Sequence, residues 1–317
     1  MGRLSGPSVA DPYRAGGGRF RPGDGVKSVP GALLRRRAAS HKGDYGHLLI
    51  VAGAVGMTGA PVLCATAALR SGAGLVTLAV PKSVYPIVAR TAPPEVMVHP
   101  VTDQKGKMTA AAFRNLAPLL ERASILAIGP GLSRTAGTRA LVRKLLRQTR
   151  QPVVLDADGI WALKGLRGLD RPRGAGEVVI TPHPGEMGRL LGVSTAAVQK
   201  DRPAAALRAA KRFGVIALLK GHRTVIADST GKVRINRSGN PGMATAGMGD
   251  ALTGIIAALV GQELPSFTAA AVGAHFHGVA GDLAAKTIGQ AGLTASDLIE
   301  RIPEVFRRAA RKQNLLA

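Results

Sequence analysis

The sequence predicts an α/β fold: a doubly wound, mostly parallel sheet flanked by helices on both faces. Short, continuously apolar runs recur along the chain, and most end at a glycine, proline or aspartate turn, as strands buried on both faces of a sheet do. Helical stretches separate these runs, which is typical of βαβ units. The composition agrees, because 46% hydrophobic and only 3% aromatic residues in a chain of 317 indicate a large core of small aliphatic side chains.

The first βαβ unit begins near residue 48. Residues 48–52 form an apolar run, a glycine-marked turn follows at 53–59, and residues 60–71 have helical character. A second apolar run, 75–80, is closed by Pro81. Two strands joined by a helix are expected to lie parallel in one sheet, because parallel strands need such a crossover.

The same pattern continues to the end of the chain. Further strands are expected at 125–128, 153–155, 178–180 and 215–219, a hairpin at 225–227 and 233–235, a helix through about 148, and three final helices near 247–260, 266–287 and 294–312. The sequence has no internal repeat of 20–50 residues, which argues against a solenoid.

The formal charge is +24, which taken alone favours a polyanion as partner. Residues 1–42 hold nine Lys or Arg against two Asp, and much of the remaining charge is scattered over expected helices such as 134–150 and 301–312. Because no aromatic residues interleave with the basic ones, we expect no nucleic-acid role. A polyanion-binding protein that uses the basic leading segment and helices is the alternative from a different class.

The sequence also predicts how the chain is divided into segments. Residues 1–40 contain three consecutive glycines, scattered prolines and no periodicity, so we expect a flexible basic N-terminal segment. Residues 41–317 are expected to form a single domain. Cys64 is the only cysteine, so neither an intramolecular disulfide nor a metal–thiolate cluster can form, and a small buried thiol is expected.

The location predicted from these features is the cytoplasm. A chain without disulfides suits a reducing compartment. No apolar run approaches the roughly 18–20 residues that span a bilayer, and the N-terminus lacks the hydrophobic core of a signal peptide. We therefore expect no membrane association.

Unusual residues fall where the expected strands end. In doubly wound sheets ligands bind beyond the carboxyl ends of the strands. The segments at these ends are 53–59, 129–131, 156–158, 181–186 and 220–224. Their coincidence predicts an enzyme.

The most informative motif spans residues 240–254, NPGMATAGMGDALTG. Gly247, Met248 and Gly249 offer backbone N–H groups where the next helix begins, and the positive end of the helix dipole favours a phosphate there. Asp250 lies in the first turn, where it can accept a proton from a hydroxyl that attacks the phosphate. The simpler alternative is a glycine turn in which Asp250 only caps the helix.

Other strand ends also allow two interpretations. Lys220 can meet a phosphate as a mobile point charge, with Gly221 and Thr224 beside it, or the segment is a plain hairpin turn. Asp156 and Asp158 can attract Mg²⁺ or can cap the following helix. His275 and His277 are two residues apart on a helix, cannot share a face, and are expected to be packing or capping residues.

A resemblance to a known family rests on five motifs together. The segment 240–254 resembles the anion hole and catalytic aspartate of ribokinase-like kinases, and within that superfamily the chain most resembles the NAD(P)H-hydrate dehydratases. The supporting motifs are HKGDYGH at 41–47, VAG through MTGA at 51–60 with ALRSGAGLV at 68–76, GPGL at 129–132, and TPHPGE at 181–186. The resemblance covers most of the chain, from about His41 to Arg308. Ile160-Trp161 departs from it, because many members have Asn there, and this puts a metal role for the 156–158 loop in doubt.

The resemblance implies a function and roles for individual residues. It implies dehydration of hydrated NADH and NADPH (NADHX and NADPHX), in the S form, with Mg²⁺ and with ADP or ATP as co-substrate; the TPHPGE form favours ADP. The implied site residues are Ala60, Gly131, His183 and Asp250 for the substrate, Lys220, Gly221, His222, Arg223, Thr224 and Gly249 for the nucleotide, Gly247, Met248 and Gly249 for the anion hole, Asp250 for catalysis, and Glu186 for metal through water. It also implies a homotetramer and a separate epimerase as a possible partner.

The main alternative within the superfamily is a vitamin or sugar kinase, which would share the fold, the anion hole and Asp250. The motifs at 41–47 and 53–60 favour the dehydratase, because such kinases do not share them in this form.

Overall fold

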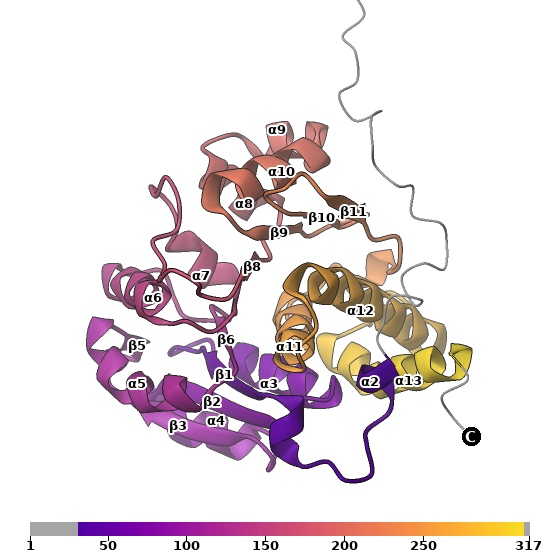
Figure 1. The fold of residues 1–317 in the computed structure, drawn as a ribbon, viewed down its shortest axis with the longest axis horizontal. Helices are drawn as coiled ribbons and strands as arrows, with labels where there is room; N and C mark the ends of the chain where they lie inside the picture. Colours follow the sequence, from indigo (N-terminus) through magenta and orange to yellow (C-terminus); the bar gives the residue numbers. More distant parts are fainter. Residues whose placement is uncertain (1–30, 314–317) are drawn as a thin grey trace, which may run out of the picture.

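A nine-stranded sheet forms the centre of the computed structural model, which describes residues 31–313 (Figure 1). Its order is β11-β10-β9-β8-β7-β6-β1-β2-β3. The strands are β1 (His47–Val51), β2 (Leu75–Pro81), β3 (Met97–Val101), β6 (Ile125–Ile128), β7 (Val153–Leu155), β8 (Val178–Ile180), β9 (Ile216–Leu219), β10 (Val225–Ala227) and β11 (Val233–Ile235). From β3 to β9 all pairs are parallel, and β10 and β11 add an antiparallel edge. The predicted doubly wound sheet is confirmed.

The strand order reverses between β1 and β6. From β1 the chain first builds outward through β2 to β3, then returns to β6 and builds in the other direction. In register, Leu49 of β1 lies between Thr77 of β2 and Leu126 of β6. The helices that follow β1 and β6, α3 and α6, therefore cover opposite faces of the sheet, and such a reversal point at the carboxyl edge is where doubly wound sheets bind ligands.

Alternate side chains of each strand belong to two separate hydrophobic cores, one on each face of the sheet. In β1, Leu48 and Ile50 join one buried cluster, whereas Leu49 and Val51 join the other. The first cluster is covered by α3 (Gly59–Arg70), α4 (Tyr85–Thr91), α11 (Met248–Gly261), α12 (Ser266–Ile288) and α13 (Ala295–Lys312). The second is covered by α5 (Phe113–Arg122), α6 (Ala136–Gln148), α7 (Ala157–Trp161), α8 (Pro184–Leu191), α9 (Thr195–Lys200) and α10 (Arg202–Phe213).

Predicted and observed elements agree to within about two residues for the central strands and the three final helices. Among the strands, β3 and the small hairpin of β4 (Asp103–Gln104) and β5 (Lys107–Met108) were not predicted, and neither were the helices α4, α5, α9 and α10. β3 is an edge strand whose residues are mostly exposed or half-buried, and it contains Pro100, so it does not read as an apolar run. Short 3-10 turns complete the fold: η1 (Lys42–Tyr45), η2 (Lys82–Val84), η3 (Ala110–Ala112) and η4 (Pro241–Met243).

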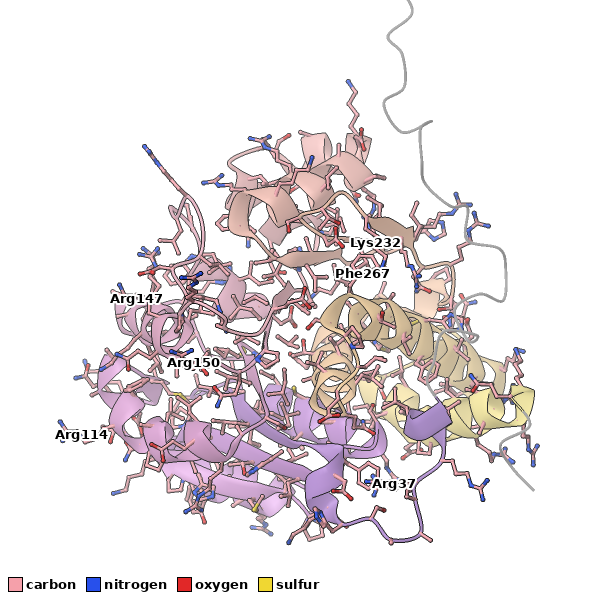
Figure 2. The ribbon with its side chains drawn as sticks, in the orientation of Figure 1. Arg37, Arg114, Arg147, Arg150, Lys232 and Phe267 are labelled. Atoms are coloured by element: carbon pink, nitrogen blue, oxygen red, sulfur yellow. The ribbon has the colours of Figure 1, made fainter. Side chains whose placement is uncertain are left out.

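The predicted N-terminal segment, 1–40, lies largely outside the described residues. Its described part begins with the short helix α2 (Gly31–Leu34), whose Leu33 and Leu34 pack against the first core cluster. Arg37, Arg114, Arg147 and Arg150, which Figure 2 labels, are exposed; Arg114 lies on α5, Arg147 near the end of α6, and Arg150 just after α6. The basic charge is thus spread over the surface. Within residues 31–313, none of the helices has the length and apolar character that a bilayer span requires.

A glycine at residue 254 allows the backbones of α11 and α3 to pack in direct contact. A Cβ atom added at Gly254 would lie 2.1 Å from the carbonyl oxygen of Cys64 and 3.0 Å from the amide nitrogen of Ala68. Both are backbone atoms, so they cannot move aside by rotating a side chain. The two helices that begin at the carboxyl edge of the sheet are held together by this contact.

We therefore expect Gly254→Ala to lower the free energy of unfolding by about 1–3 kcal/mol, because overpacking forces the helices apart. Urea denaturation would measure it. Gly292→Ala is the matched control, since a Cβ there meets nothing within 4 Å, and its effect should stay within about 0.5 kcal/mol. Equal stabilities of the two variants would mean that α3 and α11 are not tightly packed.

Candidate active site

The loops after β1 and β6 meet at the carboxyl edge of the sheet. The Gly53 amide donates to the Pro130 carbonyl oxygen at 2.8 Å. A Cβ at Gly131 would lie 3.3 Å from the Cβ of Ala60 and 2.9 Å from that of Met57. Ala60 and Gly131, which the sequence assigns to one substrate, are therefore neighbours, and only a residue without a side chain fits at 131.

Helix α11 begins at this same edge. Gly247 precedes it with φ +83°, a left-handed conformation that favours glycine. A Cβ at Gly247 would also lie 2.6 Å from the Cδ1 atom of Leu63. Met248 and Gly249 open the helix, where amides lack intrahelical acceptors and the dipole is positive. These features suit an anion, and Asp250 lies within the same turn.

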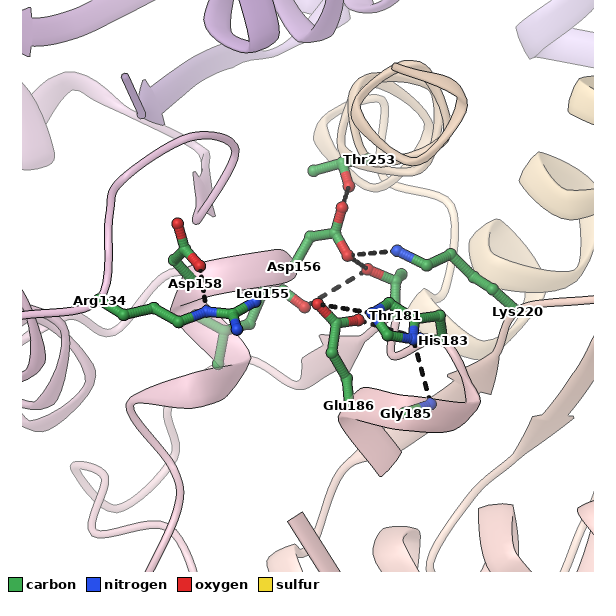
Figure 3. A network of polar contacts seen from close by, with 10 residues as sticks. All are labelled: Arg134, Leu155, Asp156, Asp158, Thr181, His183, Gly185, Glu186, Lys220 and Thr253. Carbon is green, nitrogen blue, oxygen red and sulfur yellow. Dashed lines mark hydrogen bonds and ion pairs between the residues drawn. The ribbon is translucent and has the colours of Figure 1, made fainter. Parts of the chain in front are cut away.

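A buried carboxylate joins three segments beside this turn (Figure 3). Asp156, at the end of β7, is 1% exposed. Its Oδ1 accepts from the Lys220 ammonium and from the Thr181 hydroxyl, each at 2.7 Å. Its Oδ2 accepts from the Thr253 hydroxyl on α11 at 2.9 Å. The carboxylate does not cap α7, because no side-chain cap bond forms there.

Lys220 reaches across the site from the end of β9. Its Nζ atom would lie 3.1 Å from a Cβ placed on Gly249, so the ammonium borders the first turn of α11. Burial lowers the pKa of Lys220, but Asp156 and other carboxylates outweigh this and the pKa lies above its usual value. Lys220 therefore presents a permanent positive charge to the turn that can bind an anion.

The rest of the predicted nucleotide segment forms the turn after β9. His222 and Arg223 are exposed, Arg223 with φ +54°, and the Thr224 hydroxyl donates to the Gly221 carbonyl oxygen at 3.0 Å. Arg202 of α10 anchors this turn by donating to the carbonyl oxygens of Leu219 and Lys220 at 3.0 and 3.2 Å. Nothing in the sequence around Arg202 indicates that role.

His183 and Glu186 form a reciprocal cap on α8. His183 Nδ1 accepts from the Gly185 amide at 3.1 Å, and Glu186 Oε2 accepts from the His183 amide at 2.9 Å. Burial, assisted by Lys220 and Arg189 and opposed by Glu186, lowers the pKa of His183. The His183 side chain is half exposed, so it remains accessible to a ligand although it caps α8.

Asp158, the other acidic residue of this loop, is held away from the nucleotide segment. It accepts from the Ser133 amide at 2.8 Å and from Arg134 Nε at 2.7 Å. In residues 31–313, no three His, Cys, Asp or Glu side chains gather in an arrangement that could hold a metal ion. Asp158 therefore secures the loop after β6.

Two further buried titratable residues, His277 and Cys64, lie beside α11. His277 of α12 lies 3.0 Å through Nε2 from the Met248 carbonyl oxygen. Burial lowers the pKa of His277 to about 4, so the ring is neutral and Nε2 donates. Cys64 is fully buried, as predicted, and burial together with Asp250 and Asp156 raises the pKa of its thiol. The sequence identified His277 as a packing residue but not its contact with Met248.

Asp250 is a weak acid in this setting. Burial is the main cause that raises its pKa to about 7, the Asp156 carboxylate adds to the rise, Lys220 opposes it, and Asp158 contributes least. A carboxyl group that exchanges its proton near neutral pH suits general acid–base chemistry.

Comparisons with known proteins agree in one family. A family model described as NAD(P)H-hydrate dehydratase matches residues 48–304. The bifunctional NAD(P)H-hydrate repair enzyme Nnr of Moorella thermoacetica is 51% identical over 87% of this chain and 52% of its own length. The ADP-dependent (S)-NAD(P)H-hydrate dehydratase of Neisseria meningitidis is 38% identical over 85% of this chain and 88% of its own. The chain spans about half the length of the bifunctional relatives.

A solved structure has the same fold. The ADP/ATP-dependent NAD(P)H-hydrate dehydratase of Bacillus subtilis, co-crystallised with ATP and Mg²⁺, is 31% identical. Its TM-score is 0.78, covering 90% of this chain and 96% of that one.

The pKa of Asp250 has a consequence for stability that needs no substrate. In an unfolded chain an aspartate has a pKa of about 3.9. A group whose pKa is higher in the folded state stabilises the fold fully at acid pH and loses that contribution as the pH rises through about 7. Asparagine does not ionise, so Asp250→Asn should be more stable than the parent at pH 8, by about 2–4 kcal/mol.

At pH 5 this advantage should shrink markedly. Urea denaturation at the two pH values measures the difference. The control is Asp170→Asn, which changes an exposed carboxylate and should give no pH-dependent difference. An Asp250→Asn advantage of the same size at both pH values would refute the raised pKa.

Proposed function

The chain belongs to the NAD(P)H-hydrate dehydratase family, and we propose that it dehydrates hydrated NADH and NADPH to NADH and NADPH, with ADP or ATP consumed in the reaction. One observation carries the proposal most directly. The Lys220 ammonium borders the amides that open α11, and Asp250, with a pKa of about 7, stands in the same turn. Phosphate binding and proton transfer are thereby combined in one place.

The proposed reaction begins with proton transfer to Asp250. The hydroxyl on carbon six of the reduced ring gives its proton to this carboxylate, while its oxygen attacks the terminal phosphorus of the nucleotide. A new O–P bond forms and the bond to the leaving nucleotide breaks, releasing AMP from ADP or ADP from ATP. The amides of residues 247–249 and Lys220 balance the developing charge.

Elimination then completes the dehydration. Hydroxide leaves carbon poorly, whereas phosphate leaves well, so phosphorylation makes the second step accessible. The C–O bond breaks with release of phosphate, the neighbouring carbon loses a proton, and the ring double bond is restored. We assign Ala60, Gly131 and His183 to the substrate, and two of these three positions have little or no side chain.

The residues present fit a Mg²⁺ ion that arrives bound to the nucleotide, because such an ion needs few protein ligands. Magnesium in phosphoryl-transfer sites keeps several waters and uses one or two carboxylates plus substrate phosphates. Glu186 is 7% exposed at the carboxyl edge and could hold such an ion through water. When bound, the ion would neutralise phosphate charge. The chemistry assigned to Asp250, Lys220 and the amides does not depend on where it sits.

Several wider proposals rest on the family resemblance. We propose that residues 41–317 act as one catalytic domain, that the protein assembles as a homotetramer in the cytoplasm, and that an epimerase supplies the S form of the substrate. The family resemblance is also compatible with fusion, because the relatives that match over half of their length are bifunctional.

The proposal is tested by incubating the protein with ADP, Mg²⁺ and hydrated NADH. The absorbance of reduced nicotinamide should return, and a parallel run with ATP gives the nucleotide preference, for which we expect ADP. The control omits the nucleotide. Nucleotide consumption with a vitamin or sugar, but no recovery of absorbance with hydrated NADH, would favour a small-molecule kinase.

Replacing the proposed base should stop the reaction without preventing nucleotide binding. Loss of a general base lowers rates by about 10²–10⁴-fold, so we expect kcat for Asp250→Asn to fall by at least that factor while calorimetry shows ADP still bound. In the parent enzyme, kcat/KM should fall as the pH drops below about 7, because Asp250 must be ionised. A fully active Asp250→Asn would refute the assignment, and Asp170→Asn serves as control.

A further inference from the structure

Asp156 makes contacts that neither metal binding nor helix capping explains. Its oxygens accept from Lys220, Thr181 and Thr253, which come from the ends of β9 and β8 and from α11. All three contacts are short, and the carboxylate is 1% exposed. Figure 3 shows Lys220 and Thr253 approaching it from different sides. The carboxylate thus joins the nucleotide segment to the helix that carries Asp250.

This carboxylate lies against the face of α11 that carries the proposed base. Thr253, which donates to Asp156 Oδ2 at 2.9 Å, follows Asp250 by three residues in the helix, and residues three apart are neighbours on a helix surface. A Cβ at Gly249, the residue before Asp250, would lie 3.5 Å from Asp156 Oδ2 and 3.1 Å from Lys220 Nζ. The charged groups that act on Asp250 are Asp156, Lys220 and, more weakly, Asp158. The buried Cys64 thiol and neutral His277 complete the titratable surroundings. Asp156 is thus the negative charge that most affects Asp250.

We propose that Asp156 is a positioning residue: it fixes the Lys220 ammonium beside the first turn of α11, and its negative charge keeps Asp250 a strong enough base to take a proton near neutral pH. The inference rests on the proposed function for the task of Asp250. The placement of Lys220, and the effect of the Asp156 charge on the ionisation of Asp250, do not depend on the proposed function.

The two effects have separate physical causes. Hydrogen bonds from Thr181 and Thr253 orient the carboxylate, and the carboxylate holds Lys220 at 2.7 Å. Like charge disfavours ionisation of a neighbouring carboxyl group, whereas an ammonium favours it. Without Asp156, Asp250 would be left with Lys220 as its dominant neighbour. It would ionise more readily and would be a weaker base.

The test measures the titration midpoint of Asp250 directly, by ¹³C NMR of protein labelled at the aspartate carboxyl carbon. The resonance is identified by its loss in Asp250→Asn. In Asp156→Asn the midpoint should move down by about one pH unit or more, as expected for loss of a like charge close by. Lys220→Met should move it up. An unchanged midpoint in Asp156→Asn would overturn the charge role.

The pH profile of kcat/KM gives a second reading. The acid limb is the range in which kcat/KM falls as the pH is lowered. In Asp156→Asn its midpoint should move to lower pH, as the NMR midpoint does, while kcat falls. Asp156→Glu keeps the charge and should restore the limb to the position of the parent enzyme. A structural role alone would lower activity in both variants and leave the limb where it was. Asp170→Asn is the matched control for the substitution.

A single substitution at Asp156 leaves a buried ammonium without its partner and could prevent folding. The double variant Asp156→Asn/Lys220→Met removes both charges. Its Asp250 midpoint should lie below that of Lys220→Met, because the two variants differ only in the charge at residue 156, and equal midpoints would overturn the proposal.

The positioning role is tested by Thr253→Val, which removes a hydrogen bond from Asp156 but no charge. The affinity for ADP, measured by calorimetry, should weaken several-fold while the Asp250 midpoint stays unchanged. An unaltered ADP affinity would refute the positioning role. The NMR titration needs no substrate, so a protein that fails to dehydrate hydrated NADH would refute the proposed function and leave the charge coupling to be judged separately.

Discussion

The site depends on one buried ion pair, between Lys220 Nζ and Asp156 Oδ1 at 2.7 Å. Removing two charges from water is costly, and their attraction offsets that cost only when the remaining hydrogen-bonding capacity is used. Thr181 and Thr253 supply that capacity. The pair consequently fixes where β7, β8, β9 and α11 meet, and it places a cation next to amides that themselves favour an anion. The ammonium and the amides together suit an anion such as a phosphate group at this point.

Close approach of backbones is the second requirement. The chain has 41 glycines and few aromatic residues, and the structure shows what this composition permits. Gly131 brings the loop after β6 against Ala60, and Gly254 lets α11 contact α3. The proposed function, with a dinucleotide beside a second nucleotide, would need such small side chains around the site. A core rich in large side chains would fill the same space.

The large positive charge has a different role from the site residues. Arg37, Arg114, Arg147 and Arg150 are exposed and come from several parts of the chain. Dispersed charge of this kind attracts anionic ligands from a distance and raises their rate of arrival. Specific recognition is left to a few buried groups whose orientation is fixed by hydrogen bonds.

The sequence by itself determined the fold class, the central strands and the glycine turn at the start of α11, to which we assign phosphate binding. Apolar runs, glycine turns and the start of a helix are local features, so their meaning is contained in a few consecutive residues. Only the tertiary structure decided what Asp156 does. Local sequence offered metal binding or capping, whereas its partners at 181, 220 and 253 come together only when four elements assemble. The same holds for Arg202 and His277, which act on residues 17–29 positions away. The pKa of Asp250 also belongs to the assembled site, because burial and the charges of remote residues set it.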